Sequence, residues 1–196
     1  MVISTAVEAN PDGHSIEYTY MRPEASWLER LLKDLFENHW DELIFGPCIQ
    51  GAVFEYHASS KPRVTMLDGY MTIDFGDWHC HLCIGPHHGP PTNPTPPNIA
   101  AWRQASKAAF FRHLNREQAP TGWGIRLWNG RDEQMITFFL PNPYYDKQMH
   151  RQKPDWRRKT PNPRAPLRPW TRRTNGIARA ERTGGSTSKP TAERQL

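Results

Sequence analysis

Apolar residues recur at four-residue spacing between Ser26 and Trp40, with further leucines and a tryptophan beside them. The members of this repeat are Leu28, Leu32, Phe36 and Trp40. Such spacing produces one broad apolar face on a helix. Ser26 and Glu29 have the spacing of a capping box, in which both side chains satisfy backbone amides at a helix start. The pattern therefore predicts a helix over 26–40 that packs on a sheet.

A second, weaker repeat follows further along the chain. Apolar residues at roughly helical spacing are Ile99, Trp102, Ala109, Phe110 and Leu114. Asn98 precedes them and can serve as an N-cap. We expect a second amphipathic helix over about 98–115.

Three turn signals between these segments divide the chain into four strands, at 50–57, 63–67, 70–75 and 78–84. The turns are Ser59 to Pro62, Asp68-Gly69 and Gly76-Asp77. Two-residue loops set the register of a hairpin, so Leu67 should face Tyr70 and Phe75 should face Trp78. The pattern predicts a four-stranded antiparallel meander.

The predicted registers sort the strand residues into two faces. The apolar face holds Val64, Met66, Met71, Ile73, Phe75, Trp78, Cys80, Leu82 and Ile84. The polar face holds Arg63, Thr65, Tyr70, Thr72, Asp74, His79, His81 and Cys83. Cross-strand rows on it are Arg63–Asp74–His79 and Thr65–Thr72–His81. The first face is a core, and the second collects the polar chemistry.

A last pair of alternating segments, at 123–127 and 136–140, flanks a turn at Asn129–Asp132. It predicts a C-terminal hairpin that extends or flanks the same sheet. The fold class expected from the whole pattern is α+β: an antiparallel sheet, made of the four-stranded meander plus this hairpin, packed by two helices.

The net charge of +5 is distributed unevenly along the chain. Residues 148–196 hold 13 of the 25 Lys and Arg residues and 3 of the 20 Asp and Glu residues. They are rich in Arg and Pro and have no apolar period, which is typical of a disordered tail. We therefore expect a domain at 1–147 and a disordered basic tail at 148–196. Such a tail suits an acidic protein partner or nucleic acid.

The remaining features of the sequence indicate the cellular compartment of the protein. No stretch approaches the roughly 20 apolar residues that span a bilayer, and the start of the chain has no signal-peptide pattern. Three cysteines are too few for a disulfide framework. These features predict a cytoplasmic protein without a membrane partner, and they leave its oligomeric state open.

Four of the nine histidines and two of the three cysteines lie in DWHCHLCIGPHHG, residues 77–89. Imidazole and thiolate are preferred donors for zinc and other late transition metals. This density makes metal binding the leading functional hypothesis, with zinc first and iron or copper as alternatives.

Strand alternation selects the ligands within this segment. Cys80 and Cys83 differ by an odd number, so they point to opposite faces. The candidate ligands are His79, His81 and Cys83 on one face, with His87 and His88 from the Pro-rich loop that follows. A minimal site is His79 with His81, or His81 with Cys83, completed by His87 or His88. Asp74, held by Arg63, would orient His79.

Four alternatives stay open at this point. The Arg63–Asp74–His79 row can be an ion-pair row with a structural role, and Cys83 beside His81 has the residue types of an activated thiol. Tyr70, Arg126 and Trp128 are candidate pocket residues. The rival function is an adaptor or nucleic-acid-binding protein acting through 148–196. Whether the protein is an enzyme depends on an open coordination position, which a sequence does not reveal.

Overall fold

The computed structural model describes residues 2–49, 51–145 and 150, and it is mostly antiparallel sheet with two α-helices. A seven-stranded sheet has the spatial order β1 (Val2–Ala9), β2 (Ser15–Met21), β10 (Ala105–Leu114), β11 (Pro120–Asn129), β12 (Gln134–Leu140), β3 (Ile44–Gly46), β6 (Tyr56–His57). A three-stranded sheet has the order β7 (Arg63–Leu67), β8 (Tyr70–Asp74), β9 (His79–Cys83). The fold class is α+β, as the sequence predicts.

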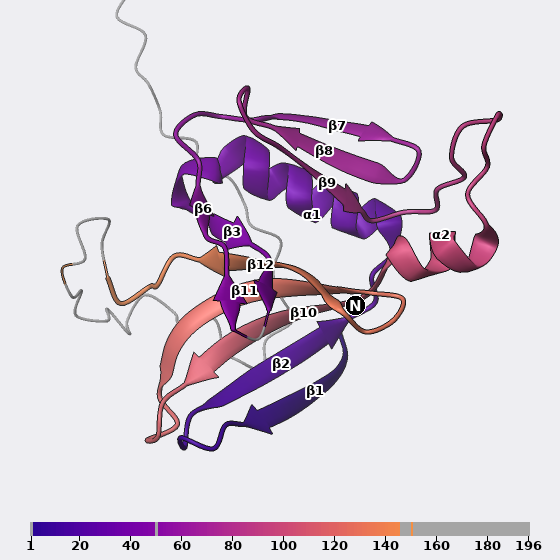
Figure 1. Cartoon of the computed structure of the whole chain (residues 1–196). Helices are drawn as coiled ribbons and strands as arrows, with labels where there is room; N and C mark the ends of the chain where they lie inside the picture. The colour runs from indigo at the N-terminus through magenta and orange to yellow at the C-terminus, as the bar shows by residue number, and fades with distance from the viewer. Residues whose placement is uncertain (1, 50, 146–149, 151–196) are drawn as a thin grey trace, which may run out of the picture. The chain divides into compact units, whose positions relative to one another are not determined.

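The remaining elements are short, apart from the first helix. They are α1 (Ala25–Asn38), a 3₁₀ turn at Trp40–Glu42, α2 (Pro97–Arg103) and a small ribbon formed by β4 (Cys48–Ile49) and β5 (Ala52–Val53). Figure 1 shows α1 running along the three-stranded sheet, with α2 in the connection from β9 to the larger sheet.

One apolar cluster joins α1 to both sheets. The helix contributes Leu28, Leu32, Leu35 and Phe36, and the cluster also contains Met71 and Ile73 of β8 and Ile125 and Phe138 of the larger sheet. The Phe36 ring lies 5.1 Å from Phe45 and 5.8 Å from Phe138, both in the larger sheet. It also lies 6.3 Å from Phe75, at the end of β8. The helix is therefore the element on which the two sheets meet.

The first predicted helix is confirmed in place and in its apolar face, although it begins one residue earlier and ends two residues earlier than 26–40. The predicted capping box is wrong. Glu24 occupies the N-cap position, no side chain caps the helix, and Ser26 lies inside the first turn.

The predicted four-stranded meander is wrong, because the small sheet has three strands. The segment expected as its first strand contributes instead to β5 and β6, which pair with β4 and β3. The two hairpin registers are confirmed: Leu67 pairs with Tyr70, and the Phe75 amide donates to the Trp78 carbonyl at 2.7 Å. The prediction that Trp78 is a core residue is wrong, because Trp78 is 61% exposed to solvent.

The second predicted helix is also wrong beyond its first turns. Only Pro97–Arg103 is helical, and Ala105–Leu114 is β10, which pairs with β2 on one side and β11 on the other. Alanines and a lysine in this segment resemble a helix locally, but two neighbouring strands satisfy its backbone amides and carbonyls. Long-range pairing overrides local propensity here.

The C-terminal hairpin is confirmed by the pairing of β11 with β12. It does not extend or flank the small meander, because both strands lie inside the seven-stranded sheet. The pairing of β1 with β2 forms a further hairpin that the sequence pattern did not indicate.

Within the described ranges, no helix is long and apolar enough to cross a membrane. The predicted tail at 148–196 lies outside the described residues except for His150.

Gly124 of β11 offers a test of the packing between β10 and β12. A Cβ atom at this position would overlap the Phe111 ring and the Phe138 carbonyl oxygen. We expect Gly124→Ala to lower the free energy of unfolding by about 1–3 kcal/mol through overpacking, measured by urea denaturation. Gly122→Ala on the same strand is the matched control, because its nearest neighbour would be the His113 Cβ at 3.9 Å. Equal losses for both variants would contradict this packing.

Candidate functional site

The turn between β7 and β8 positions the loop that follows β9. Asp68 and Gly69 have φ values of 45° and 77°, the left-handed conformations of a tight hairpin turn. The Gly69 carbonyl accepts the amides of Ile84 and Gly85, each at 3.0 Å. A side chain at Gly69 would overlap the backbone of the loop, so only glycine allows this close approach.

The Asp68 carboxylate fastens the same loop further along. It accepts the His88 amide at 2.9 Å and the Gly89 amide at 2.8 Å. These two hydrogen bonds lower the pKa of the Asp68 carboxyl, so the carboxylate form is retained at neutral pH. Together with Gly69, Asp68 folds the loop back over the end of β9.

This folding places His87 against Cys83. The Cys83 Sγ lies 3.4 Å from His87 Nδ1, and the thiol also lies 3.6 Å from the Gly85 carbonyl oxygen. Cys83 is 3% exposed and His87 is 4% exposed. Cys83 belongs to the polar face of β9 by register, and the loop rather than the sheet core buries it. The result is a buried thiol–imidazole pair.

Tyr70 and Arg103 complete the surroundings of this pair. Tyr70 is directly opposite Cys83 in the β8–β9 ladder, and its ring meets the His87 imidazole edge to face at 5.1 Å. Burial raises the pKa of the Cys83 thiol, while a hydrogen bond with the Tyr70 hydroxyl and the positive charge of Arg103 act in the opposite direction. The thiol, rather than the thiolate, is thus the resting form of Cys83.

The second ring nitrogen of His87 is unsatisfied. Nε2 is buried and has no hydrogen-bond partner in the described part of the chain. Burying an imidazole nitrogen without a partner costs about 1–3 kcal/mol. The fold bears this cost while holding Nδ1 next to the Cys83 sulfur.

His79 and His81 form a separate, exposed pair on the same face of β9. Their ring centroids are 4.9 Å apart, whereas alternate Cα atoms on a strand are about 6.5–7 Å apart. The two rings therefore lean toward one another. Thr72 Oγ1 lies 2.8 Å from His81 Nδ1, which leaves Nε2 of His81 as the outward nitrogen.

The residues expected to support His79 are only partly arranged as predicted. Arg63 donates to Asp74 at 2.8 Å, so this ion pair is present. Asp74 lies opposite His79 in the ladder, but its carboxylate is engaged by Arg63 and by the Gly76 amide at 2.9 Å. Those two hydrogen bonds are the main cause of the lowered pKa of Asp74, and the charge of His79 adds little.

The structure thus divides the candidate ligands into two pairs. Cys83 and His87 are together in the interior, and His79 and His81 are together at the surface. The side chain of His88 is exposed, and its described bond is made by its backbone amide to Asp68. Among residues 2–49, 51–145 and 150, no group of three or more His, Cys, Asp or Glu side chains is placed to hold one metal ion.

The candidate pocket residues are also divided. Arg126 and Trp128 both contact Tyr18 on the seven-stranded sheet: Arg126 donates to the Tyr18 hydroxyl at 2.6 Å, and the Trp128 ring meets Tyr18 at 5.7 Å. Trp128 is 9% exposed and packs in a second apolar cluster. Tyr70, by contrast, makes its described ring contact with His87 in the small sheet.

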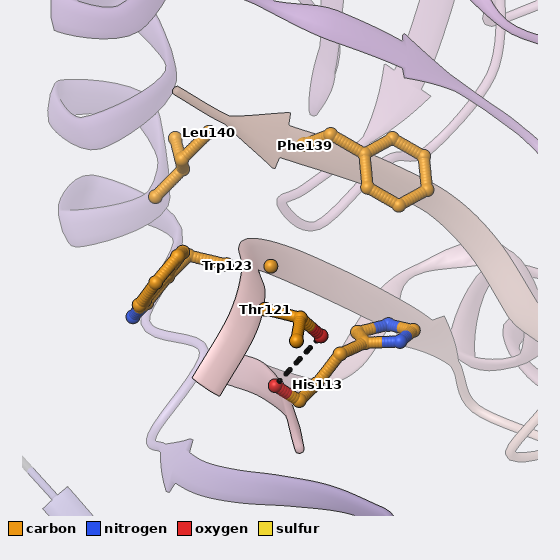
Figure 2. Close-up of a pocket in the computed structure, with 6 residues that line it drawn as sticks. His113, Thr121, Trp123, Phe139 and Leu140 are labelled. Atoms are coloured by element: carbon orange, nitrogen blue, oxygen red, sulfur yellow. Dashed lines mark hydrogen bonds between the residues drawn. The ribbon is translucent and has the colours of Figure 1, made fainter. Parts of the chain in front are cut away.

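A shallow hollow of about 220 Å³ lies at the end of the β10–β11 hairpin. Figure 2 shows its lining side chains pointing apart, with His113 and Phe139 on one side of the strands and Trp123 on the other. Burial and the Arg126 charge lower the pKa of His113, so its imidazole is neutral at physiological pH. The diverging walls make this hollow a poorer ligand site than the Cys83–His87 pair.

Two contributors to the site were not indicated by the sequence pattern. Asp68 carries the signal of a hairpin turn, and nothing local shows that its carboxylate also fastens a loop twenty residues away. Arg103 was not identified as a site residue because the pattern predicted a helix that continues past it to about residue 115. A shorter helix, ended by the return to a strand at Ala105, would have left Arg103 at its C-terminus.

Comparison with known proteins adds little to this geometry. A protein-family model described as a family of unknown function, DUF7676, matches residues 5–160. No curated protein matches the sequence. The crystal structure of ChuX aligns at 11% identity with a TM-score of 0.44, covering 69% of this chain and 68% of that chain. A likeness at that level supports no statement about function.

The Asp68 anchor can be tested by hydrogen exchange. We expect Asp68→Ala to speed exchange at the His88 and Gly89 amides, because both lose their acceptor. The same amides should lose protection in the wild-type protein as pH falls through the lowered pKa of Asp68, after correction for intrinsic exchange rates. Asp77→Ala, in the exposed β8–β9 turn, is the control. Unchanged protection at both amides would show that the carboxylate does not hold the loop.

Proposed function

This chain belongs to a family of unknown function, DUF7676, and we propose that it binds a transition metal ion at the Cys83–His87 pair. The family description names no activity, so the proposal rests on the residues of the chain itself. Its central observation is the 3.4 Å separation between Cys83 Sγ and His87 Nδ1.

This separation suits two ligands of one tetrahedral ion. Zinc lies about 2.3 Å from a thiolate sulfur and about 2.0 Å from an imidazole nitrogen, which at a tetrahedral angle puts the two donor atoms about 3.5 Å apart. The separation of the two donor atoms is therefore the one that a shared ion requires. Zinc is the first candidate, and iron and copper are the alternatives, because all three accept imidazole and thiolate.

The surroundings of the pair also favour a bound cation. Both side chains are more than nine-tenths buried, so an ion would be shielded from water that competes for its coordination sphere. Burial raises the pKa of the free thiol, and metal coordination is the interaction that stabilises a thiolate in such a place.

Two protein donors leave part of a coordination sphere for other ligands. The Tyr70 phenol is next to Cys83, and an exogenous small molecule would supply the remaining positions. An open position is the property that separates catalytic zinc sites from structural ones. Whether this protein catalyses a reaction depends on what fills it.

The same 3.4 Å also fits a thiol–imidazole hydrogen bond with no metal. Metal content of the purified full-length protein, followed by Co²⁺ titration, separates the two cases. Tetrahedral Co²⁺ bound by a thiolate produces visible and near-ultraviolet absorption that a hydrogen bond does not. We expect near-stoichiometric binding, weakened more than about 100-fold by Cys83→Ser or His87→Ala, since loss of a ligand costs at least as much as loss of a supporting residue.

Matched controls are available on the same strand. Cys80→Ser removes a half-buried thiol on the opposite face of β9, and it should leave the Co²⁺ absorption intact. The double variant His79→Ala/His81→Ala removes the surface pair and should also leave it intact. Circular dichroism verifies that each variant is folded. Absence of metal uptake by folded wild-type protein, or binding that survives the Cys83 and His87 substitutions, would refute the proposal.

Partner binding through residues 148–196 stays a prediction from the sequence, because this segment lies outside the described residues apart from His150. Its charge suits an acidic protein or nucleic acid. Removing the segment should abolish such binding and leave Co²⁺ absorption at Cys83 unchanged.

A further inference from the structure

His79 and His81 lie at the exposed end of β9, apart from the buried pair of Cys83 and His87. Both imidazoles project from one face of the strand, because alternate residues of a strand share a face. Their ring centroids are 4.9 Å apart, and the ring planes meet at 63°. Two nitrogen-bearing rings are thus held close together in contact with solvent, and neither contributes to the Cys83–His87 pair.

This separation matches two imidazoles that share one metal ion. Metal–nitrogen bonds of about 2.0–2.1 Å at a tetrahedral angle put the centres of two bound rings about 5 Å apart. The observed 4.9 Å is close to that value. An edge-to-face contact between two rings has a similar spacing, so the hydrogen bond made by His81 is needed as a second observation.

Thr72 orients the His81 ring in the way that coordination requires. Its Oγ1 lies 2.8 Å from His81 Nδ1, across the pair that the β8–β9 register sets. The hydroxyl accepts from a protonated Nδ1, and the neutral imidazole then carries its free lone pair on the outward Nε2. Metal-bound histidines usually have such a partner on the second ring nitrogen, which fixes the tautomer and the ring orientation.

The charges beside the pair are compatible with a bound cation. Asp74 lies opposite His79 in the ladder. The Arg63 guanidinium donates to the Asp74 carboxylate at 2.8 Å, so the positive charge of Arg63 is compensated by its own partner.

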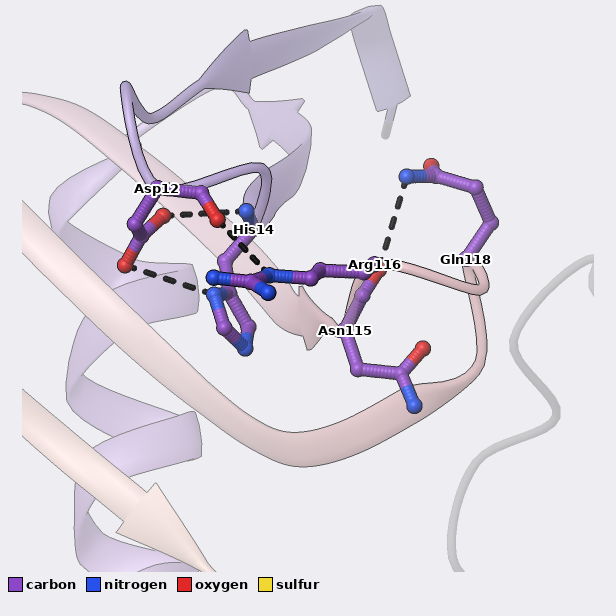
Figure 3. Close-up of polar contacts among 5 residues, drawn as sticks. All are labelled: Asp12, His14, Asn115, Arg116 and Gln118. Atoms are coloured by element: carbon purple, nitrogen blue, oxygen red, sulfur yellow. Dashed lines mark hydrogen bonds and ion pairs between the residues drawn. The ribbon is translucent and has the colours of Figure 1, made fainter.

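His14 provides a contrast at another exposed turn. Its Nδ1 lies 3.3 Å from the Asp12 carboxylate, but Arg116 Nε donates to the Asp12 backbone carbonyl at 2.9 Å. Figure 3 shows the three side chains together. A permanent positive charge beside this His–Asp pair opposes the approach of a second cation. The pair of His79 and His81 is the better cation site of the two.

We propose that His79 and His81 bind a divalent late transition-metal ion through their imidazole nitrogens, at a second site weaker than the Cys83–His87 site. Imidazole suits zinc, nickel and copper. Two nitrogen donors in solvent leave the other coordination positions to water or to an exogenous ligand. The two sites share no donor atom, so the second site does not depend on the first.

The test is titration of the full-length protein, without a polyhistidine tag, with Zn²⁺, which does not oxidise thiols. Calorimetry should resolve a tighter and a weaker equivalent. Cys83→Ser should remove the tighter step only. His79→Ala or His81→Ala should weaken the second step at least about tenfold, since loss of a ligand costs no less than loss of a supporting residue. During this step the ¹⁵N resonances of both imidazoles should shift.

Thr72→Val tests the orienting role of the hydroxyl. It should weaken the second step about tenfold, and Thr72→Ser, which keeps the hydroxyl, should restore the affinity. Equal affinities for Thr72→Val and wild type would refute that role.

His14→Ala is the matched control, because it also removes one exposed imidazole, and it should leave both steps unchanged. Circular dichroism verifies that each variant is folded. If the tighter step is absent from wild type, the Cys83–His87 proposal fails and the weaker step still tests this site. A folded wild type without the weaker step, or a weaker step that persists in both His79→Ala and His81→Ala, would overturn the proposal.

Discussion

The apolar stripe of α1 is the interaction on which the rest of the structure depends. Leu28, Leu32, Leu35 and Phe36 are at most 9% exposed, and they bury side chains of both sheets in one cluster. Among the described strands the two sheets are separate and share no paired edge, and the helix is their common packing surface. Shortening any of these side chains would open a cavity between two sheets at once, with the cost that accompanies large-to-small changes in a core.

The candidate site follows from this arrangement. Because α1 packs against the apolar face of the small sheet, the opposite face of β8 and β9 is left for polar side chains. The Asp68-Gly69 turn then folds the Pro-rich loop across one end of that face and buries Cys83 under His87. The other end, with His79 and His81, stays exposed. β9 thus contributes to two environments. Cys83 is buried beneath the loop, whereas His79 and His81, beyond the reach of the loop, are exposed to solvent.

Local patterns predicted much of this correctly. The helix at Ala25–Asn38, the registers of the two hairpins around Asp68-Gly69 and Gly76-Asp77, and the opposite orientations of Cys80 and Cys83 follow from periods of 3.6 and 2 and from two-residue turns. The pattern failed at Ala105–Leu114, where a helix was expected and a strand was found. A segment between two partners takes its conformation from their backbones, and one of these partners, β2, lies about ninety residues earlier in the sequence.

The sequence by itself determined the α+β class, the first helix, the hairpin registers and the gathering of histidine and cysteine within residues 77–89, because each depends on neighbours within a few positions. Only the tertiary structure decided which of those residues meet. Cys83 joins His87 because the loop after β9 folds back and places that imidazole against the thiol, while His81 leans toward His79 and its Nδ1 is engaged by Thr72. That fold-back depends on Asp68 and Gly69, about twenty residues away, and contacts at that separation leave no periodic trace in a sequence.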